Sequence, residues 1–179
     1  MIAVLALVLA ALFGAGDQYL GSFSMHPWMA DVSLLSAPWL VLAFAAGCTQ
    51  REPKRAALLG LGCTLSALLG YGLMALSPVE NAHLTVTTAP GFAISESRVI
   101  FGGLVTGPLF AWFGQRWRVH GAWIGALATA AALCLEPLVR IPAGREIRSE
   151  KVLLAEVALG LALAAYVAAS RIAGREPAR

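Results

Sequence analysis

The chain has 179 residues, of which 59% are hydrophobic and only 13% are charged, and its mean hydropathy is +0.75. This composition excludes an ordinary soluble protein and predicts one all-α domain over residues 1–179, a polytopic transmembrane bundle of about six helices. The net charge of +3 is small, and no basic stripe with interleaved aromatic residues indicates nucleic-acid binding.

Apolar runs predict the helices, in chain order, at about residues 2–22, 33–48, 56–77, 98–114, 122–139 and 152–170. A bundle of five spans is the alternative. The first run has no basic region before it and no clear cleavage site, so we expect a retained helix rather than a signal peptide. Glycines on the later helices, such as Gly60, Gly70 and Gly107, are expected to let backbones pack closely.

Lys and Arg residues in the short connections predict the orientation of the bundle. The connections after the second and fourth predicted helices, together with the C-terminal tail, carry eight of them, against five on the opposite side. We therefore expect a multi-pass protein of the inner (plasma) membrane with both termini in the cytoplasm. Cys48, Cys63 and Cys134 have no paired spacing, so neither a disulfide framework nor a metal site is expected. We also expect no cofactor.

Three carboxylates, Asp17, Glu136 and Glu156, lie inside otherwise apolar segments. Because the predicted helices alternate in direction, all three fall in the same outer half of the membrane. An ionisable group in hydrocarbon costs at least about 2.5 kcal/mol, so it usually faces the interior of a bundle and has a function there. The alternative for Asp17 and Glu156 is snorkelling near a helix end, and for Glu136 it is an ion pair with Arg140 on the same helix.

Aromatic and polar side chains are predicted at the same depth as these carboxylates, where they would line a common chamber. The long connection 78–97, with its turn at Pro90 and Gly91, is a candidate lid, because such a length is unusual inside a compact bundle. The side chains that we expect to bind substrate are Gln18, Tyr19, Trp28, Trp39, Tyr71 and Phe101.

Carboxyl groups and aromatic rings in a dry cavity are suited to carbocation chemistry. A carboxyl in apolar surroundings can keep its proton at neutral pH and act as a donor. The carboxylate left after protonation of an alkene needs hydrogen bonds, which Gln18, Tyr19 or a second carboxyl could supply. The carbocation needs aromatic faces and the exclusion of water. No Asp-rich diphosphate motif occurs, which favours protonation-initiated cyclisation of a prenyl chain over loss of diphosphate.

Two family resemblances follow from these residues. Over residues 10–140 the chain resembles a group of small bacterial membrane proteins of five to six helices, through Ala37-Pro38-Trp39 with Phe44 and Gly47, Leu69-Gly70-Tyr71, Gly107-Pro108, and Glu136 before Pro137. In size and in its intramembrane acids it is also similar to the small integral membrane terpene cyclases of bacterial natural-product pathways, the drimentine type, which act on farnesylated indole or cyclodipeptide substrates.

The second resemblance implies a metal-independent isomerase that acts on a lipophilic prenylated substrate taken from the lipid bilayer. One of Asp17, Glu136 and Glu156 would be the acid and another group the base. The main alternative is a non-enzymatic binding or transport subunit whose carboxylates bind a cationic solute or carry protons. A third is a structural membrane protein that organises partners. No feature of the pattern predicts an oligomeric state.

Overall fold

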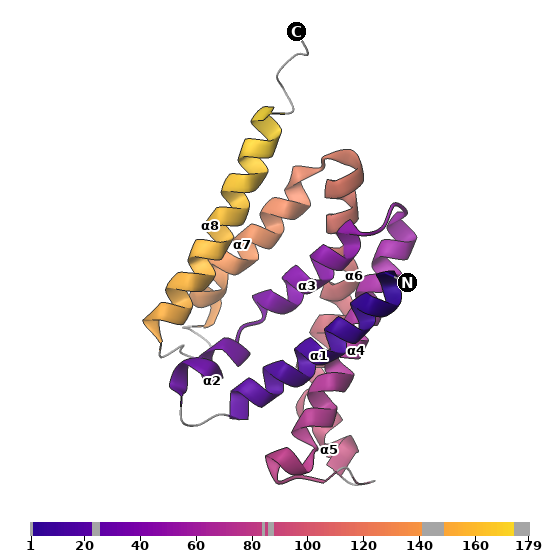
Figure 1. Ribbon diagram of the computed structural model, residues 1–179, viewed down its shortest axis with the longest axis vertical. Coiled ribbons are helices and arrows are strands. Elements are labelled where there is room, and N and C mark those ends of the chain that lie inside the picture. Colours follow the sequence, from indigo (N-terminus) through magenta and orange to yellow (C-terminus); the bar gives the residue numbers. More distant parts are fainter. Residues whose placement is uncertain (1, 23–25, 84, 86–87, 141–148, 174–179) are drawn as a thin grey trace.

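The structure, a computed structural model, describes residues 2–22, 26–83, 85, 88–140 and 149–173, and this part of the chain is all-α (Figure 1). It contains eight α-helices and one short 3₁₀ helix. In chain order they are α1 (Ile2–Ser22), α2 (Pro27–Ser33), α3 (Ala37–Cys48), α4 (Pro53–Ala75), η1 (Pro78–Glu80), α5 (Thr88–Ser95), α6 (Ser97–His120), α7 (Trp123–Arg140) and α8 (Glu150–Ala173).

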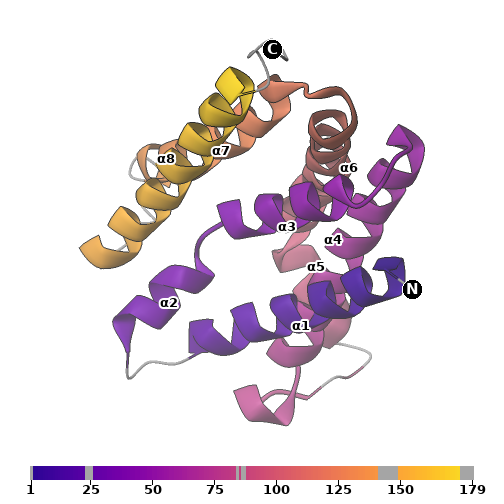
Figure 2. The same cartoon turned by 45° about the horizontal axis from the view of Figure 1, so that its top comes forward.

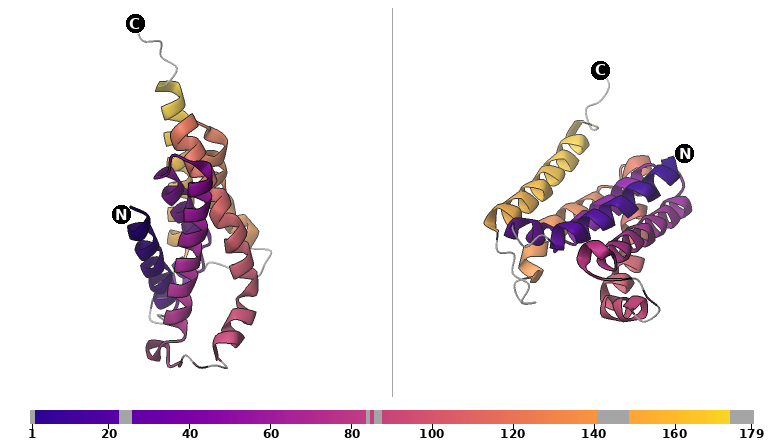
Figure 3. Two further views of the ribbon diagram at one scale, coloured as in Figure 1. Left: turned by 90° about the vertical axis from the view of Figure 1, so that its right-hand side faces the viewer. Right: turned by 60° about the horizontal axis from the view of Figure 1, so that its bottom comes forward.

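Helices α1, α3, α4 and α6 form the main body of the bundle. Helix α1 packs against α4, and both α3 and α4 pack against α6. Helices α7 and α8 form an antiparallel hairpin beside this body, with α7 against α6 and α3 (Figure 2). Helix α2 connects α1 to α3 and also contacts α8. Helix α5 lies at the end of the bundle where α4 finishes and α6 begins (Figure 3).

The six helices predicted from apolar runs are confirmed as α1, α3, α4, α6, α7 and α8. Helix α3 begins at Ala37, later than predicted, because residues 27–33 form the separate helix α2. Helix α6 continues beyond its predicted end to His120 and stops at Gly121, whose φ of 61° is the left-handed conformation that favours glycine after a helix. The connection 78–97 is not a plain loop, since it contains η1 and α5.

Many large hydrophobic side chains lie on the outside of the helices, as expected for a surface in contact with lipid. Helices α1 and α4 and the segment Glu150–Ser170 of α8 are long and apolar enough to cross a membrane, and α3 and Trp123–Leu138 are shorter apolar helices. Large residues such as Leu12 and Leu69 are more than 60% exposed, whereas the interior contains alanines. These features indicate a multi-pass membrane protein. The count of about six spans stays a prediction.

Small residues let the central helices approach closely, as expected for this glycine-rich chain. A methyl group at Gly70 of α4 would overlap the carbonyl oxygen of Ala11 on α1. A methyl group at Gly60 would meet the carbonyl oxygen of Gly107 on α6. Backbone carbonyls cannot move aside as flexible side chains can, so these contacts fix the spacing of α1, α4 and α6.

The contact between α1 and α4 can be tested with two alanine substitutions on one helix. A methyl group at Gly14 would overlap the backbone of Ala67, whereas one at Gly16 meets nothing within 4 Å. We expect Gly14→Ala to lower the free energy of unfolding by about 1–3 kcal/mol through overpacking. Gly16→Ala should leave it unchanged or raise it by up to about 1 kcal/mol through helix propensity. Thermal unfolding of both variants in one detergent measures the difference, and equal stabilities would contradict this packing.

Candidate functional site

Asp17 lies on the face of α1 that packs into the bundle. The buried residues of α1 are Ala10, Gly14 and Asp17, whose spacing places them on one side of a helix. Asp17 is only 8% exposed, and its Oδ2 accepts a hydrogen bond from Nε1 of Trp39 at 3.3 Å. The packing face of α1 therefore places the Asp17 carboxyl group beside the indole of Trp39 on α3, near the C-terminal end of α1.

A cavity of about 420 Å³ opens beside this pair of side chains. It lies between α1, α3, α4 and α6, with contributions from α5 and from the connection between α2 and α3. Its volume is within the range of about 300–1,000 Å³ that is typical of small-molecule sites. The polar and aromatic residues that line it are Asp17, Ser33, Ser36, Trp39, Thr64, Tyr71, Phe92, Glu96 and Thr106.

Aromatic rings form a continuous series along this cavity, which we call the Asp17 cavity. The ring centroids of Trp39 and Tyr71 are 6.3 Å apart, and those of Tyr71 and Phe92 are 6.0 Å apart. On its other side Trp39 meets Phe13 edge-on, with a centroid distance of 5.4 Å. Three helices, α3, α4 and α5, thus supply the three rings that line the cavity.

Glu136 has a different setting, at the beginning of α3. Its Oε1 accepts a hydrogen bond from the backbone N–H of Ser36 at 2.5 Å, and its Oε2 accepts one from Ala37 at 2.6 Å. The hydroxyl of Ser36, the N-cap residue, makes no capping bond, and a carboxylate from α7 instead accepts the hydrogen bonds of these two backbone N–H groups. The alternative partner Arg140 has a side chain outside the described residues.

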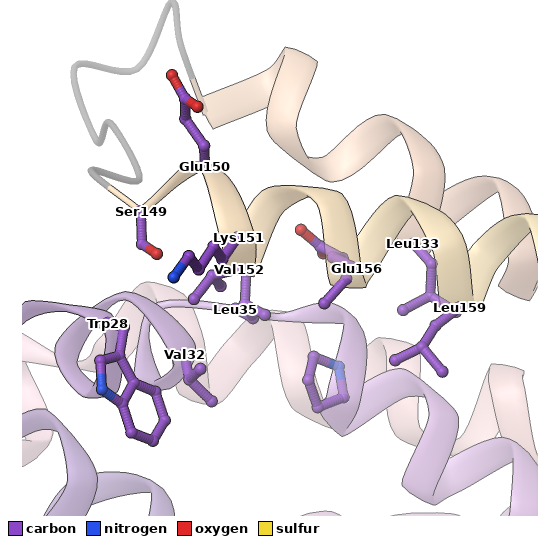
Figure 4. Close-up of a pocket in the computed structure, with 12 residues that line it drawn as sticks. Trp28, Val32, Leu35, Leu133, Ser149, Glu150, Lys151, Val152, Glu156 and Leu159 are labelled. Atoms are coloured by element: carbon purple, nitrogen blue, oxygen red, sulfur yellow. The ribbon is translucent and has the colours of Figure 1, made fainter.

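Glu156 lines a second, larger cavity of about 930 Å³ between α2, α3, α7 and α8 (Figure 4). This residue is 3% exposed. Trp28, which is 48% exposed, lies in the wall of the same cavity. We call it the Glu156 cavity. The two cavities are neighbours, because Leu35 lines both of them.

The structure therefore brings together part of the predicted set of site residues. Asp17, Trp39 and Tyr71 meet at one cavity, whereas Trp28 and Glu156 meet at the other. Phe101 is 71% exposed and lines neither cavity, nor do Gln18 and Tyr19. The three carboxylates lie towards the same end of the bundle, as the alternating helix directions require, but they occupy three separate settings.

The sequence did not single out Phe92 or Thr64, and Glu96 falls within the connection 78–97 that was predicted as a candidate lid. Phe92 comes from the connection that had been predicted as a lid, and Thr64 lies among apolar residues in the middle of α4. Gly72 has no side chain, and this lets the ring of Phe92 approach α4. A methyl group at Gly72 would stand 3.1 Å from Cε1 of that ring. Glycine next to Tyr71 was the available signal for a close aromatic neighbour.

No family model, no curated protein and no solved structure matches this chain. Its function is therefore inferred from the geometry of the two cavities. Among the described residues, no three His, Cys, Asp or Glu side chains are grouped as ligands of a metal ion.

The bonds from Glu136 to α3 predict a structural effect of removing its charge. We expect Glu136→Gln to lower the free energy of unfolding by about 1–3 kcal/mol, because an amide offers one acceptor where the carboxylate offers two. Hydrogen exchange at the amides of Ser36 and Ala37 should become faster.

The control is Glu52→Gln, which removes the same charge from an exposed ion pair with Arg55, worth at most about 1 kcal/mol. Thermal unfolding and amide exchange of the purified variants measure both effects. Unchanged exchange at Ser36 and Ala37 in Glu136→Gln would contradict the assigned bonds.

Proposed function

We propose that this protein is a membrane-embedded terpene cyclase that uses Asp17 to protonate a prenyl alkene. The observation that carries the proposal is the Asp17 cavity, in which a carboxyl group that is 8% exposed lies beside the rings of Trp39, Tyr71 and Phe92. A buried acid and a wall of aromatic rings are the two elements that protonation-initiated cyclisation requires.

The reaction begins when the carboxylic acid of Asp17 gives its proton to one carbon of an alkene in the substrate. The π electrons of that alkene form the new C–H bond and leave a carbocation on the neighbouring carbon. Electron pairs of further alkenes in the chain then close the rings. The last cation loses a proton to a base, which restores a double bond, so the product is an isomer of the substrate.

Each lining residue has a role in this scheme. The indole N–H of Trp39 donates to the Asp17 carboxyl and stabilises the carboxylate that forms on proton transfer. The rings of Trp39, Tyr71 and Phe92 stabilise the cation by about 0.5–2 kcal/mol each. Glu96, the second carboxyl that lines the cavity, is the base that we propose for the final step. After the product leaves, water enters the cavity and carries the proton from Glu96 back to Asp17, which restores both groups.

Glu136 is a positioning residue in this proposal. Its carboxylate accepts hydrogen bonds from the first residues of α3, and α3 carries Trp39. Both oxygens of the Glu136 carboxylate are engaged with backbone donors, and Glu136 is not among the residues that line either cavity. Of the three acids considered from the sequence, Asp17 is thus the best donor, and Glu156 faces another cavity.

The substrate that we propose is lipophilic and prenylated, such as a farnesyl chain on an indole or cyclodipeptide head group. The apolar side chains of the Asp17 cavity, among them Leu40, Leu68 and Ile100, suit an isoprenoid chain. We further propose a six-span topology in the inner membrane, with both termini in the cytoplasm and the cavities near the outer surface. Helix directions that alternate along the chain support this topology.

The proposal predicts that Asp17→Asn abolishes cyclisation, because an amide cannot give up a proton as an acid does. Product formation should fall by about 100-fold or more. Trp39→Phe keeps a ring but removes the hydrogen bond to Asp17, so its loss should be smaller. Purified protein is incubated with farnesylated indoles in deuterated buffer, and mass spectrometry detects an isomer carrying one carbon-bound deuteron.

Glu52→Gln, an exposed carboxylate outside both cavities, is the control and should retain full turnover. Full turnover in a folded Asp17→Asn variant would refute the assignment of the donor. Unreacted substrate across a panel of acceptors, from folded wild-type protein, would favour the binding or transport function instead.

A second prediction concerns the exclusion of water by α5. Phe92→Ala removes one wall of the cavity, so water should reach the carbocation and compete with the base. We expect a new hydroxylated product, heavier than the substrate by one water, alongside less of the isomer. Ile94→Ala on the same helix is the control, since Ile94 is 74% exposed. An unchanged product mixture in Phe92→Ala would show that α5 does not close the cavity.

A further inference from the structure

Basic side chains gather at the end of the bundle where α3 and α6 finish. Arg51 lies in the connection from α3 to α4, and Lys54 and Arg55 lie in the first turn of α4. Arg116 and Arg118 lie in the last two turns of α6, and all five side chains are exposed. Figure 1 shows that the α3–α4 connection and the turn from α6 to α7 lie at the same end of the molecule.

One acidic side chain accompanies these cations in the part of the chain that the structure describes. It is Glu52, whose Oε2 lies 3.0 Å from Nε of Arg55 in an exposed ion pair. No described residue forms a salt bridge with the other four cations. The remaining described acids lie towards the opposite end of the bundle: Asp17, Asp31, Glu80, Glu96, Glu136, Glu150 and Glu156.

A buried glutamine joins the two basic segments. Gln115 of α6 is 1% exposed, and its Nε2 donates a hydrogen bond to the backbone carbonyl of Arg51 at 2.7 Å. Beside it, a methyl group at Gly114 would overlap the carbonyl oxygen of Phe44 on α3. The connection after α3 is thereby held against the last turns of α6. We call the group of cations that results the basic surface: Arg51, Lys54, Arg116 and Arg118.

The basic surface lies at the boundary of the apolar helices. Arg51 follows the end of α3 at Cys48 by three residues, and Lys54 is the second residue of α4, which is long and apolar enough to cross a membrane. The guanidinium carbon of Arg116 lies 5.4 Å from the ring centroid of Trp112. Trp112 is 37% exposed, and exposed tryptophans are typical of the level of lipid head groups. The cation–π contact therefore holds Arg116 at that level.

We propose that the basic surface binds the phosphate group of an anionic phospholipid. A guanidinium presents paired N–H donors that match phosphate oxygens, and the Lys54 ammonium adds a compact charge. Groups of Lys and Arg at the ends of membrane helices suit such head groups. An acidic protein fits less well, because these cations lie within about two turns of the apolar helices and not on a projecting segment. This site does not depend on the cyclase proposal.

The test compares phosphatidylglycerol and phosphatidylcholine, two lipids with the same oleoyl chains and different head groups. Native mass spectrometry of the delipidated full chain in an uncharged detergent gives the dissociation constant of the first bound lipid. We expect phosphatidylglycerol to bind at least about tenfold more tightly, which corresponds to about 1.4 kcal/mol. Arg116→Gln should weaken its binding by about fivefold, the ratio for about 1 kcal/mol, and adding Arg118→Gln should weaken it further.

A matched control on the same helix separates this site from the effect of net charge. Arg98→Gln removes an exposed cation near the start of α6, and we expect less than about twofold change because charges are screened over such a distance. Gln115→Met keeps every charge and removes the bond to Arg51. We expect it to weaken phosphatidylglycerol binding by about twofold to fivefold, because the cations are then less well preorganised.

Two further measurements fix the source of the phosphate and the independence of the site. Glycerophosphoglycerol, the head group without its chains, should not compete with phosphatidylglycerol, because the bound molecule is a lipid. Asp17→Asn should bind phosphatidylglycerol as the wild type does, so the result is separate from that of the cyclase assay.

Four outcomes would overturn the proposal. Equal affinity for the two lipids would leave the basic surface to an acidic protein partner. Equal losses in Arg98→Gln and Arg116→Gln would show a general effect of net charge. Competition by glycerophosphoglycerol would assign the surface to soluble phosphate esters. Wild-type affinity in the folded double variant of Arg116 and Arg118 would place the lipid elsewhere.

Discussion

The two hydrogen bonds that the backbone N–H groups of Ser36 and Ala37 donate to Glu136 hold the start of α3, the helix on which both cavities depend. Helix α3 contributes Trp39 to one cavity and Pro38 to the other, and the segment before it separates them. A helix start in a membrane protein has little water to satisfy its N–H groups, so a carboxylate from a distant helix stabilises it strongly. Glu136 thus holds the start of the helix that carries the indole bonded to Asp17.

Close backbone contact supplies the rigidity that this arrangement requires. Where glycine allows carbonyl groups of neighbouring helices to touch, as at Gly60 and Gly70, the helices cannot slide without losing contact over a wide area. Leucine side chains are then free to face lipid, and alanines fill the interior. Such packing holds a carboxyl and several aromatic rings at fixed distances, and preorganisation of this kind is the main contribution of a protein scaffold to electrostatic catalysis.

The apolar runs were sufficient to predict the principal helices, and alternation of helix direction was sufficient to place Asp17, Glu136 and Glu156 towards one end. Because Asp17, Trp39 and Tyr71 were predicted at the same depth in the membrane, their proximity could also be predicted. The partner of Glu136 could not be predicted, because a side-chain pattern does not show which backbone N–H groups at a helix start will face a given carboxylate. Phe92 reaches its cavity only because α5 folds back towards α4, and local sequence does not determine that path.

Leu35 forms a wall that the two cavities share. This residue is 8% exposed and lines both of them, so a molecule that pushes it aside in one changes the space in the other. Two ligands that share a movable wall are thermodynamically linked: each must alter the affinity of the other by the same factor. A molecule in the Glu156 cavity would thereby act as an effector of whatever occupies the space beside Asp17, with no direct contact between the two molecules.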